Sequence, residues 1–115
     1  MRYDVVIIGA GAAGFACALT LGSANDKFDW AKDKKYLILD DNKSDLNVGK
    51  YFNVAGVDSG INGVDLLLKM KKQLEIYKDV ELKDEKATKI DNLGEYFKIT
   101  TQNSTFEASI VVLAT

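Results

Sequence analysis

The chain has 115 residues, of which 47% are hydrophobic and 28% charged, and its formal net charge is −2. This length supports the single core of one soluble domain, and the small charge gives no attraction for nucleic acid or for an anionic membrane. With no histidine, and with Cys17 as its one cysteine, the sequence excludes an intrachain disulfide, a Cys-x-x-Cys pair, a histidine-containing metal site and a Ser-His-Asp triad.

The first forty residues predict a strand, a turn, a helix and a second strand. Residues 3–8 (YDVVII) form the β-branched apolar run of a strand buried in a parallel sheet. Because this run lacks a signal-peptide cleavage pattern, we expect a cytoplasmic protein. Small helix-forming residues predict a helix over 12–21, and YLIL at 36–39 predicts a second buried strand. Residues 22–35 between them indicate a helix end and a surface insertion, since such connections usually take about 2–6 residues.

The remainder of the chain predicts a loop, one helix and several strands. Residues 42–62 form a long glycine-containing loop, and the apolar spacing of residues 63–77 indicates an amphipathic helix. The predicted strands are a short one at 80–82, three alternating segments at 87–91, 95–102 and 105–108, and a further apolar strand at 109–115. No apolar run reaches the roughly 18 residues of a membrane span. We therefore predict an α/β, Rossmann-like domain with a parallel sheet and a small antiparallel β-meander.

A glycine motif joins the first predicted strand to the helix. Its residues are Gly9, Ala10, Gly11, Ala12, Ala13 and Gly14, in the spacing G-x-G-x-x-G. The pattern alone is weak, but its place between a buried strand and a helix is typical of a dinucleotide-binding turn. In such a turn the first glycine permits the bend, the second admits the pyrophosphate, and the third lets helix and strand pack closely. The alternative is a glycine-rich turn in a domain that binds something else or nothing.

An acidic residue follows the second predicted strand, where dinucleotide-binding domains bind a ribose hydroxyl. Asp40 comes directly after LIL, and Asp41 is the candidate if the strand ends one residue later. Asp40 lies further along than the usual spacing of about 20 residues, as expected if residues 22–35 contain an insertion. An acid here disfavours the 2′-phosphate of NADP, although Asp40 could equally be a solvated strand end. The glycine motif itself does not separate NAD from FAD.

Four stretches resemble the N-terminal FAD-binding segment of thioredoxin reductase-like flavoproteins, in the pyridine nucleotide-disulphide oxidoreductase superfamily. They are DVVIIGAGAAG at the N-terminus, YFNVAGV at 51–57, GINGVDLLLKMKKQ at 60–73, and the pair KATKID and SIVVLAT. The resemblance implies that FAD is the cofactor and that the 115 residues are one FAD-binding domain, part of a larger protein with two dinucleotide domains. NAD(P)H would bind at a second domain outside these residues.

The resemblance also implies individual site residues. Asn53 matches an asparagine beside the flavin, and Ala87 matches the small residue whose backbone contacts adenine. Ala114 and Thr115 match the start of the family's Ala-Thr-Gly, whose glycine would be residue 116, so the domain is expected to be incomplete. The family's Gly-Gly-Gln-like segment near the flavin ring has no clear counterpart in DDNKSDLNVGK, where only Gly49 is a candidate. We therefore expect intact contacts to the adenosine and pyrophosphate and leave those to the flavin ring open.

Two functional hypotheses follow. The first is the FAD-binding portion of an NAD(P)H-dependent oxidoreductase of thioredoxin reductase-like type, with a small-molecule dinucleotide as its ligand and no activity as an isolated fragment. The second is a non-catalytic regulatory module that binds NAD or FAD in the same turn. With either, the strand at 109–115 could leave an unpaired sheet edge and make the chain self-associate. Cys17, among small helix residues, is expected to be a buried core residue rather than a reactive thiol.

Overall fold

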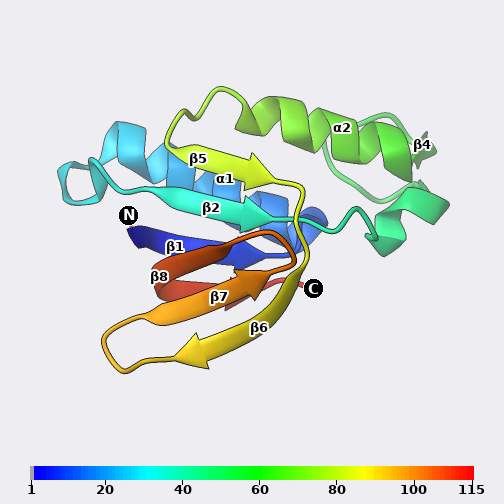
Figure 1. Ribbon diagram of the computed structural model, residues 1–115. Helices are drawn as coiled ribbons and strands as arrows, with labels where there is room; N and C mark the ends of the chain where they lie inside the picture. Colours follow the sequence, from blue (N-terminus) through cyan, green and yellow to red (C-terminus); the bar gives the residue numbers. More distant parts are fainter. Residues whose placement is uncertain (1) are drawn as a thin grey trace.

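A computed structural model describes residues 2–115 and shows a six-stranded sheet flanked by two helices (Figure 1). The strands are β1 (Arg2–Ile8), β2 (Tyr36–Leu39), β5 (Val80–Lys83), β6 (Ala87–Asn92), β7 (Phe97–Thr101) and β8 (Thr105–Leu113). Their order across the sheet is β5-β2-β1-β8-β7-β6, parallel from β5 to β8 and antiparallel from β8 to β6. The predicted α/β fold with a parallel sheet and an antiparallel meander is confirmed.

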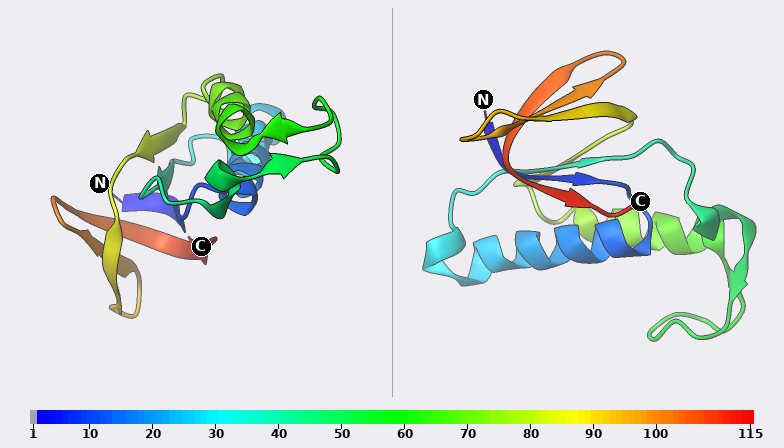
Figure 2. Two further views of the ribbon diagram at one scale, coloured as in Figure 1. Left: turned by 90° about the vertical axis from the view of Figure 1, so that its right-hand side faces the viewer. Right: turned by 90° about the horizontal axis from the view of Figure 1, so that it is seen from below.

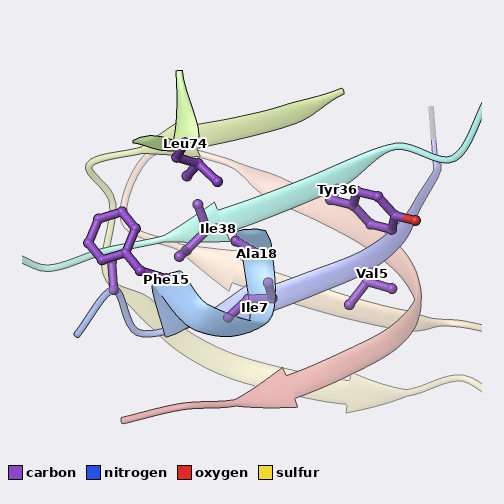
Figure 3. Packing of buried hydrophobic residues seen from close by; sticks show 8 residues of the cluster. Val5, Ile7, Phe15, Ala18, Tyr36, Ile38 and Leu74 are labelled. Carbon is purple, nitrogen blue, oxygen red and sulfur yellow. The ribbon is translucent and has the colours of Figure 1, made fainter. Parts of the chain in front are cut away.

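The parallel strands have a core on each face. Helices α1 (Ala12–Lys27) and α2 (Gly63–Leu74) cover one face, and the meander of β6 and β7 curls over the other (Figure 2). Beneath the helices, Phe15 and Ala18 of α1 pack with Ile7 of β1 and Ile38 of β2 (Figure 3). The core on the other face is formed by residues of the parallel strands and of the meander. They are Tyr3, Val6, Leu37, Leu39, Ile99 and Ala108. Alternate residues of β1 from Val5 to Ile8, and of β2, thus face opposite cores, which explains why these stretches are apolar throughout.

The segments predicted as two strands at 105–108 and 109–115 form the single strand β8. Its first residues pair with β7, from Phe97 opposite Ala108 to Thr100 opposite Thr105. From Glu107 onward it pairs with β1 in parallel, as far as Leu113 opposite Ile8. One strand therefore belongs to the meander and to the parallel sheet. The separation was wrong because no glycine or proline marks a break between Ala108 and Ser109.

The second half of β8 has β1 as its one pairing partner among the described residues. Two large side chains there are exposed, Ile110 at 56% and Leu113 at 68%. The apolar surface and open strand edge that the sequence predicts are present. Self-association through this edge stays a prediction.

Helix α1 is longer than predicted and continues through residues 22–27. Gly22 lies inside the helix and does not end it. A Cβ at this position would lie 2.8 Å from the ring of Tyr77, so the glycine allows close packing. The buried Asn25 side chain holds the last turns by donating to the Lys34 carbonyl (2.8 Å) and accepting from the Tyr36 hydroxyl (2.8 Å). The insertion is thus shorter than predicted and contains the 3-10 helix η1 (Asp29–Ala31).

The predicted loop at 42–62 contains a 3-10 helix, η2 (Asp45–Val48), and a two-stranded hairpin of β3 (Lys50–Tyr51) and β4 (Ile61–Asn62). The Asn62 side chain accepts a hydrogen bond from the Asp65 N–H (2.9 Å) and caps α2. That helix ends at Leu74 instead of at residue 77. In the described part of the chain, no helix has the length and apolar character needed to cross a membrane.

Candidate functional site

A cavity of about 460 Å³ lies at the carboxyl ends of the parallel strands. The glycine turn follows β1, Asp40 follows β2, and Ala114 follows β8, so the strand directions bring these segments together. Ten of the twelve predicted site residues line this cavity, namely Gly9, Ala10, Gly11, Ala12, Ala13, Asp40, Asp41, Ala87, Ala114 and Thr115. Gly14 and Asn53 do not line it. The topology therefore brings together residues from four separate parts of the chain.

The glycine turn is fixed between the ends of β2 and β8. Gly9 donates its N–H to the Leu39 carbonyl (2.8 Å), and Ala114 donates its own to the Ile8 carbonyl (2.8 Å). Gly9 has φ +108°, a conformation that side chains rarely adopt, and a Cβ on it would lie 2.5 Å from the Ala114 oxygen. Only glycine fits at this first position of the motif.

Gly14 lies below the cavity and brings α1 against the turn. It is buried, and a Cβ on it would overlap the carbonyl oxygen of Gly9 and lie 2.8 Å from the carbonyl carbon. The third glycine thus serves the helix–strand packing that the motif predicts. Gly14 therefore acts on a ligand only indirectly, by fixing the position of the start of α1.

The N-terminus of α1 is free to face an anion. Gly11 is its N-cap and provides no side-chain cap, and the first turn contains no acidic residue. The first N–H groups of a helix have no intrahelical acceptor and carry the positive end of its dipole. Because Ala12 and Ala13 line the cavity, these groups open onto it. This arrangement suits a phosphate group.

Two acidic residues stand on the side of the cavity formed by the end of β2. The Asp40 and Asp41 carboxylates accept hydrogen bonds from the N–H groups of Asn42 (3.2 Å) and Lys43 (3.1 Å), and each bond uses one oxygen. Asp40 is half-buried, whereas Asp41 is exposed. Desolvation raises the pKa of Asp40, and the neighbouring Asp41 and Asp84 carboxylates raise it further against the lowering effect of the Asn42 N–H. The remaining oxygens are suited to accept hydrogen bonds from hydroxyl groups.

Another part of the cavity lining was missed by sequence reasoning. It is formed by residues of the η2 region and β3, including Lys43, Ser44, Asp45, Leu46 and Tyr51. The Tyr51 hydroxyl donates to the Leu46 carbonyl (3.2 Å) and so holds η2 in place. Glu85 and Lys86 also line the cavity, before Ala87. The one signal that could have found these residues is that most of them lie within a few positions of Asp41 or Ala87 in the sequence.

Asn53 is exposed in the turn between β3 and β4, outside the cavity. Gly56 in the same turn has φ +84°, which explains a glycine there. Cys17 is half-buried on α1 against the helix-covered core, where burial raises the pKa of its thiol. Its environment is that of the predicted core residue, because a thiol with a raised pKa is less reactive.

A second cavity, of about 560 Å³, lies on the other side of Asp40 beneath α2. Apolar side chains such as Phe15, Leu67 and Leu74 form much of its lining. It shares Ala10, Asp40 and Ser44 with the first cavity but contains neither Gly11 nor Ala87. The glycine turn therefore opens onto the smaller cavity.

Comparison with known proteins agrees with this geometry. The family described as pyridine nucleotide-disulphide oxidoreductase matches residues 3–115. The chain belongs to this family. Among curated relatives, a thioredoxin reductase of Treponema pallidum (strain Nichols) is 31% identical over 113 residues, covering 98% of this chain and 35% of the relative.

Solved structures show the same likeness to thioredoxin reductases. A thioredoxin reductase from Gloeobacter violaceus superposes with a TM-score of 0.85 at 29% identity, over 99% of this chain and 36% of that one. Thioredoxin reductase from Streptococcus pyogenes gives 0.84 at 31% identity, over 99% and 35%. The chain thus resembles thioredoxin reductases throughout and spans about a third of the length of each relative.

Proposed function

We propose that the chain is the FAD-binding portion of an NAD(P)H-dependent oxidoreductase of thioredoxin reductase-like type. The observation that carries this proposal is the cavity in which the glycine turn, the uncapped start of α1 and the acid after β2 face one another. Family membership supports the proposal, since the family model matches residues 3–115. Together these features favour a dinucleotide over other phosphorylated ligands.

Each part of the cavity would hold one part of the cofactor. The pyrophosphate would lie against Gly11 and the first N–H groups of α1, with the ribose hydroxyls at Asp40 or Asp41. The adenine would lie at the Ala87 backbone, near Ala114 and Thr115. Asn53 would approach the flavin from the loop outside the cavity. These assignments use both the backbone donors of the glycine turn and the carboxylates that follow β2.

When bound, FAD supplies the site with a group that accepts hydride and passes electrons on. The chain's own residues bind and orient its ADP half. In the proposal, the NAD(P)H domain and the electron acceptor's site belong to the remainder of a longer protein. We therefore expect no turnover from the 115-residue chain alone. The alternative, a regulatory module that binds NAD or FAD, is favoured if the chain prefers NAD.

A cofactor titration tests the proposed function. We expect the 115-residue chain to bind FAD, with a rise in its melting temperature that NAD does not reproduce, because a ligand stabilises the state it binds. Isothermal titration calorimetry with FAD and NAD would measure both affinities directly. Stabilisation by NAD but not by FAD would favour the regulatory module. A chain that responds to neither would contradict both hypotheses.

The affinity for FAD is expected to depend on the protonation of Asp40. Because the pKa of this carboxyl is raised, protonation removes the charged acceptor of the ribose hydroxyls at a pH above the ordinary aspartate range. FAD affinity should fall as the pH is lowered through that raised pKa, and its titration between about pH 7.5 and pH 4.5 would show this.

The Asp40→Asn variant is the control, because it cannot titrate at this position. It should bind FAD more weakly than the wild type at neutral pH, with a flatter pH dependence. The contribution of Asp40 to folding stability has the opposite sign. A raised carboxyl pKa contributes stability that is present below the pKa of the unfolded chain and is lost as the pH rises through the folded value. An equal pH dependence in both proteins would assign the ribose to another group.

A further inference from the structure

The cavity is lined by more negatively than positively charged side chains, so its net charge does not favour an anion. Four are carboxylates, those of Asp40, Asp41, Asp45 and Glu85, and two are the lysines Lys43 and Lys86. A pyrophosphate in this cavity therefore depends on hydrogen-bond donors close to its oxygens more than on the net charge of the lining. The start of α1 supplies such donors on one side of the glycine turn.

Ser44 stands on the other side of the same turn. A Cβ built on Gly11 would lie 3.1 Å from the Ser44 Oγ and 3.9 Å from its Cβ, so the hydroxyl faces the second glycine of the motif. The second glycine is the one whose backbone a pyrophosphate approaches. Both residues line the cavity. A phosphate beside Gly11 would therefore lie within reach of the Ser44 hydroxyl.

The Ser44 hydroxyl has a proton to donate. Its oxygen accepts the N–H of Leu46 (3.2 Å) as the N-cap of η2. A hydroxyl can accept hydrogen bonds and donate one at the same time. Within residues 2–115 its proton has no acceptor. The side chain is half-buried and lines the cavity, so a ligand there can reach this hydroxyl.

The loop that carries Ser44 is held from two sides. The Ser44 carbonyl accepts a hydrogen bond from the Asn47 N–H (3.1 Å), and the Tyr51 hydroxyl donates one to the Leu46 carbonyl. Gly63, at the start of α2, packs so closely on the Leu46 carbonyl that no side chain would fit there. Because these contacts fix the backbone around it, Ser44 is positioned before a ligand arrives.

We propose that the Ser44 hydroxyl donates a hydrogen bond to the cofactor's pyrophosphate, opposite the N–H groups of Gly11 and α1. The inference rests on the proposed function and deepens it by assigning a ligand-binding residue in the stretch DDNKSDLNVGK, where the family pattern has no clear match. The site would then bind the pyrophosphate between a helix terminus and a side-chain hydroxyl.

Calorimetric titration with ADP and with adenosine tests this role in the 115-residue chain. Ser44→Ala removes the donor and should weaken ADP binding about tenfold, as expected for a hydrogen bond to a charged group. Adenosine, which lacks phosphates, should bind the variant as it binds the wild type. Ser44→Thr keeps the hydroxyl and should stay within about twofold of the wild type.

Two further variants separate phosphate binding from capping of η2. Aspartate is as good an N-cap as serine but cannot donate and carries a negative charge, so Ser44→Asp should keep the loop and weaken ADP binding more than Ser44→Ala. Ser109→Ala, on the exposed part of β8, is the matched control and should change neither affinity.

The outcomes distinguish this inference from the proposed function. If the wild type binds ADP and Ser44→Ala binds it equally well, the role of Ser44 is wrong and the FAD site stands. An equal loss for ADP and adenosine, or recovery of ADP binding in Ser44→Asp, would also overturn it, because the side chain would then act through the loop. A wild type that binds neither ADP nor FAD would refute the proposed function, and the inference with it.

Discussion

Replacing Gly14 with alanine is expected to lower the free energy of unfolding by more than about 3 kcal/mol, enough to leave much of a marginal domain unfolded. The new Cβ would overlap the Gly9 carbonyl oxygen, so α1 would have to move away from the turn. That movement would also disturb Phe15 and Ala18, which are buried against the sheet. Urea denaturation followed by far-ultraviolet circular dichroism would measure the change.

Alanine favours a helix by up to about 1 kcal/mol over glycine, so propensity works against the expected loss. The control is Gly94→Ala, in the turn between β6 and β7. Gly94 also needs a positive φ, +94°, but a Cβ there meets nothing within 4 Å. It should cost only about 1 kcal/mol of backbone strain. Similar losses in the two variants would show that close packing at Gly14 does not hold the fold together.

The second large effect is expected at Gly11, and it falls on binding instead of folding. Gly11→Val should weaken ADP binding at least about a hundredfold, because the branched side chain fills the space that a pyrophosphate needs beside the backbone and separates it from the nearby donors. The protein should remain folded, since Gly11 has φ −89° and its Cβ would touch only the side chain of Ser44. Calorimetry with ADP and thermal melting would measure the two properties.

Adenosine serves as the control ligand for Gly11→Val, because it reaches the ribose and adenine parts of the cavity without a phosphate. Its affinity should change by no more than a few-fold. Gly11→Ala should fall between the wild type and the valine variant for ADP. Unchanged ADP binding in Gly11→Val would mean that the phosphates lie elsewhere, whereas a large loss of stability would mean that Gly11 serves the fold.

The elements that the sequence predicts best are those whose patterns are local. The apolar runs of β1 and β2 and the glycines between them describe the βαβ unit without reference to the rest of the chain. The last turns of α1 could not be predicted in this way. They depend on Asn25, whose partners are Lys34, Tyr36 and Asp79 beyond the helix. The continuity of β8 likewise depends on strands distant in the sequence.

The candidate site likewise contains residues that local sequence patterns predict and residues that they do not. Gly9, Asp40 and Ala114 follow parallel strands, and residues at the carboxyl ends of such strands meet at one edge of the sheet. Ser44 and Tyr51 reach the cavity because η2 is folded back by contacts with β3 and with the start of α2. No periodicity or motif encodes these contacts. Asn53, assigned by resemblance, lies outside the cavity, so its part in binding stays a prediction.

The contact between Gly9 and the end of β8 has a practical consequence for handling this protein. Ala114 and Thr115 form part of the cavity wall, whereas β1 begins at the opposite end of the parallel strands (Figure 1). An affinity tag fused after Thr115 would start at this cavity and would occupy space that the proposed function assigns to a ligand. A tag placed before the N-terminus would leave the pocket accessible, and binding data are best collected on that version.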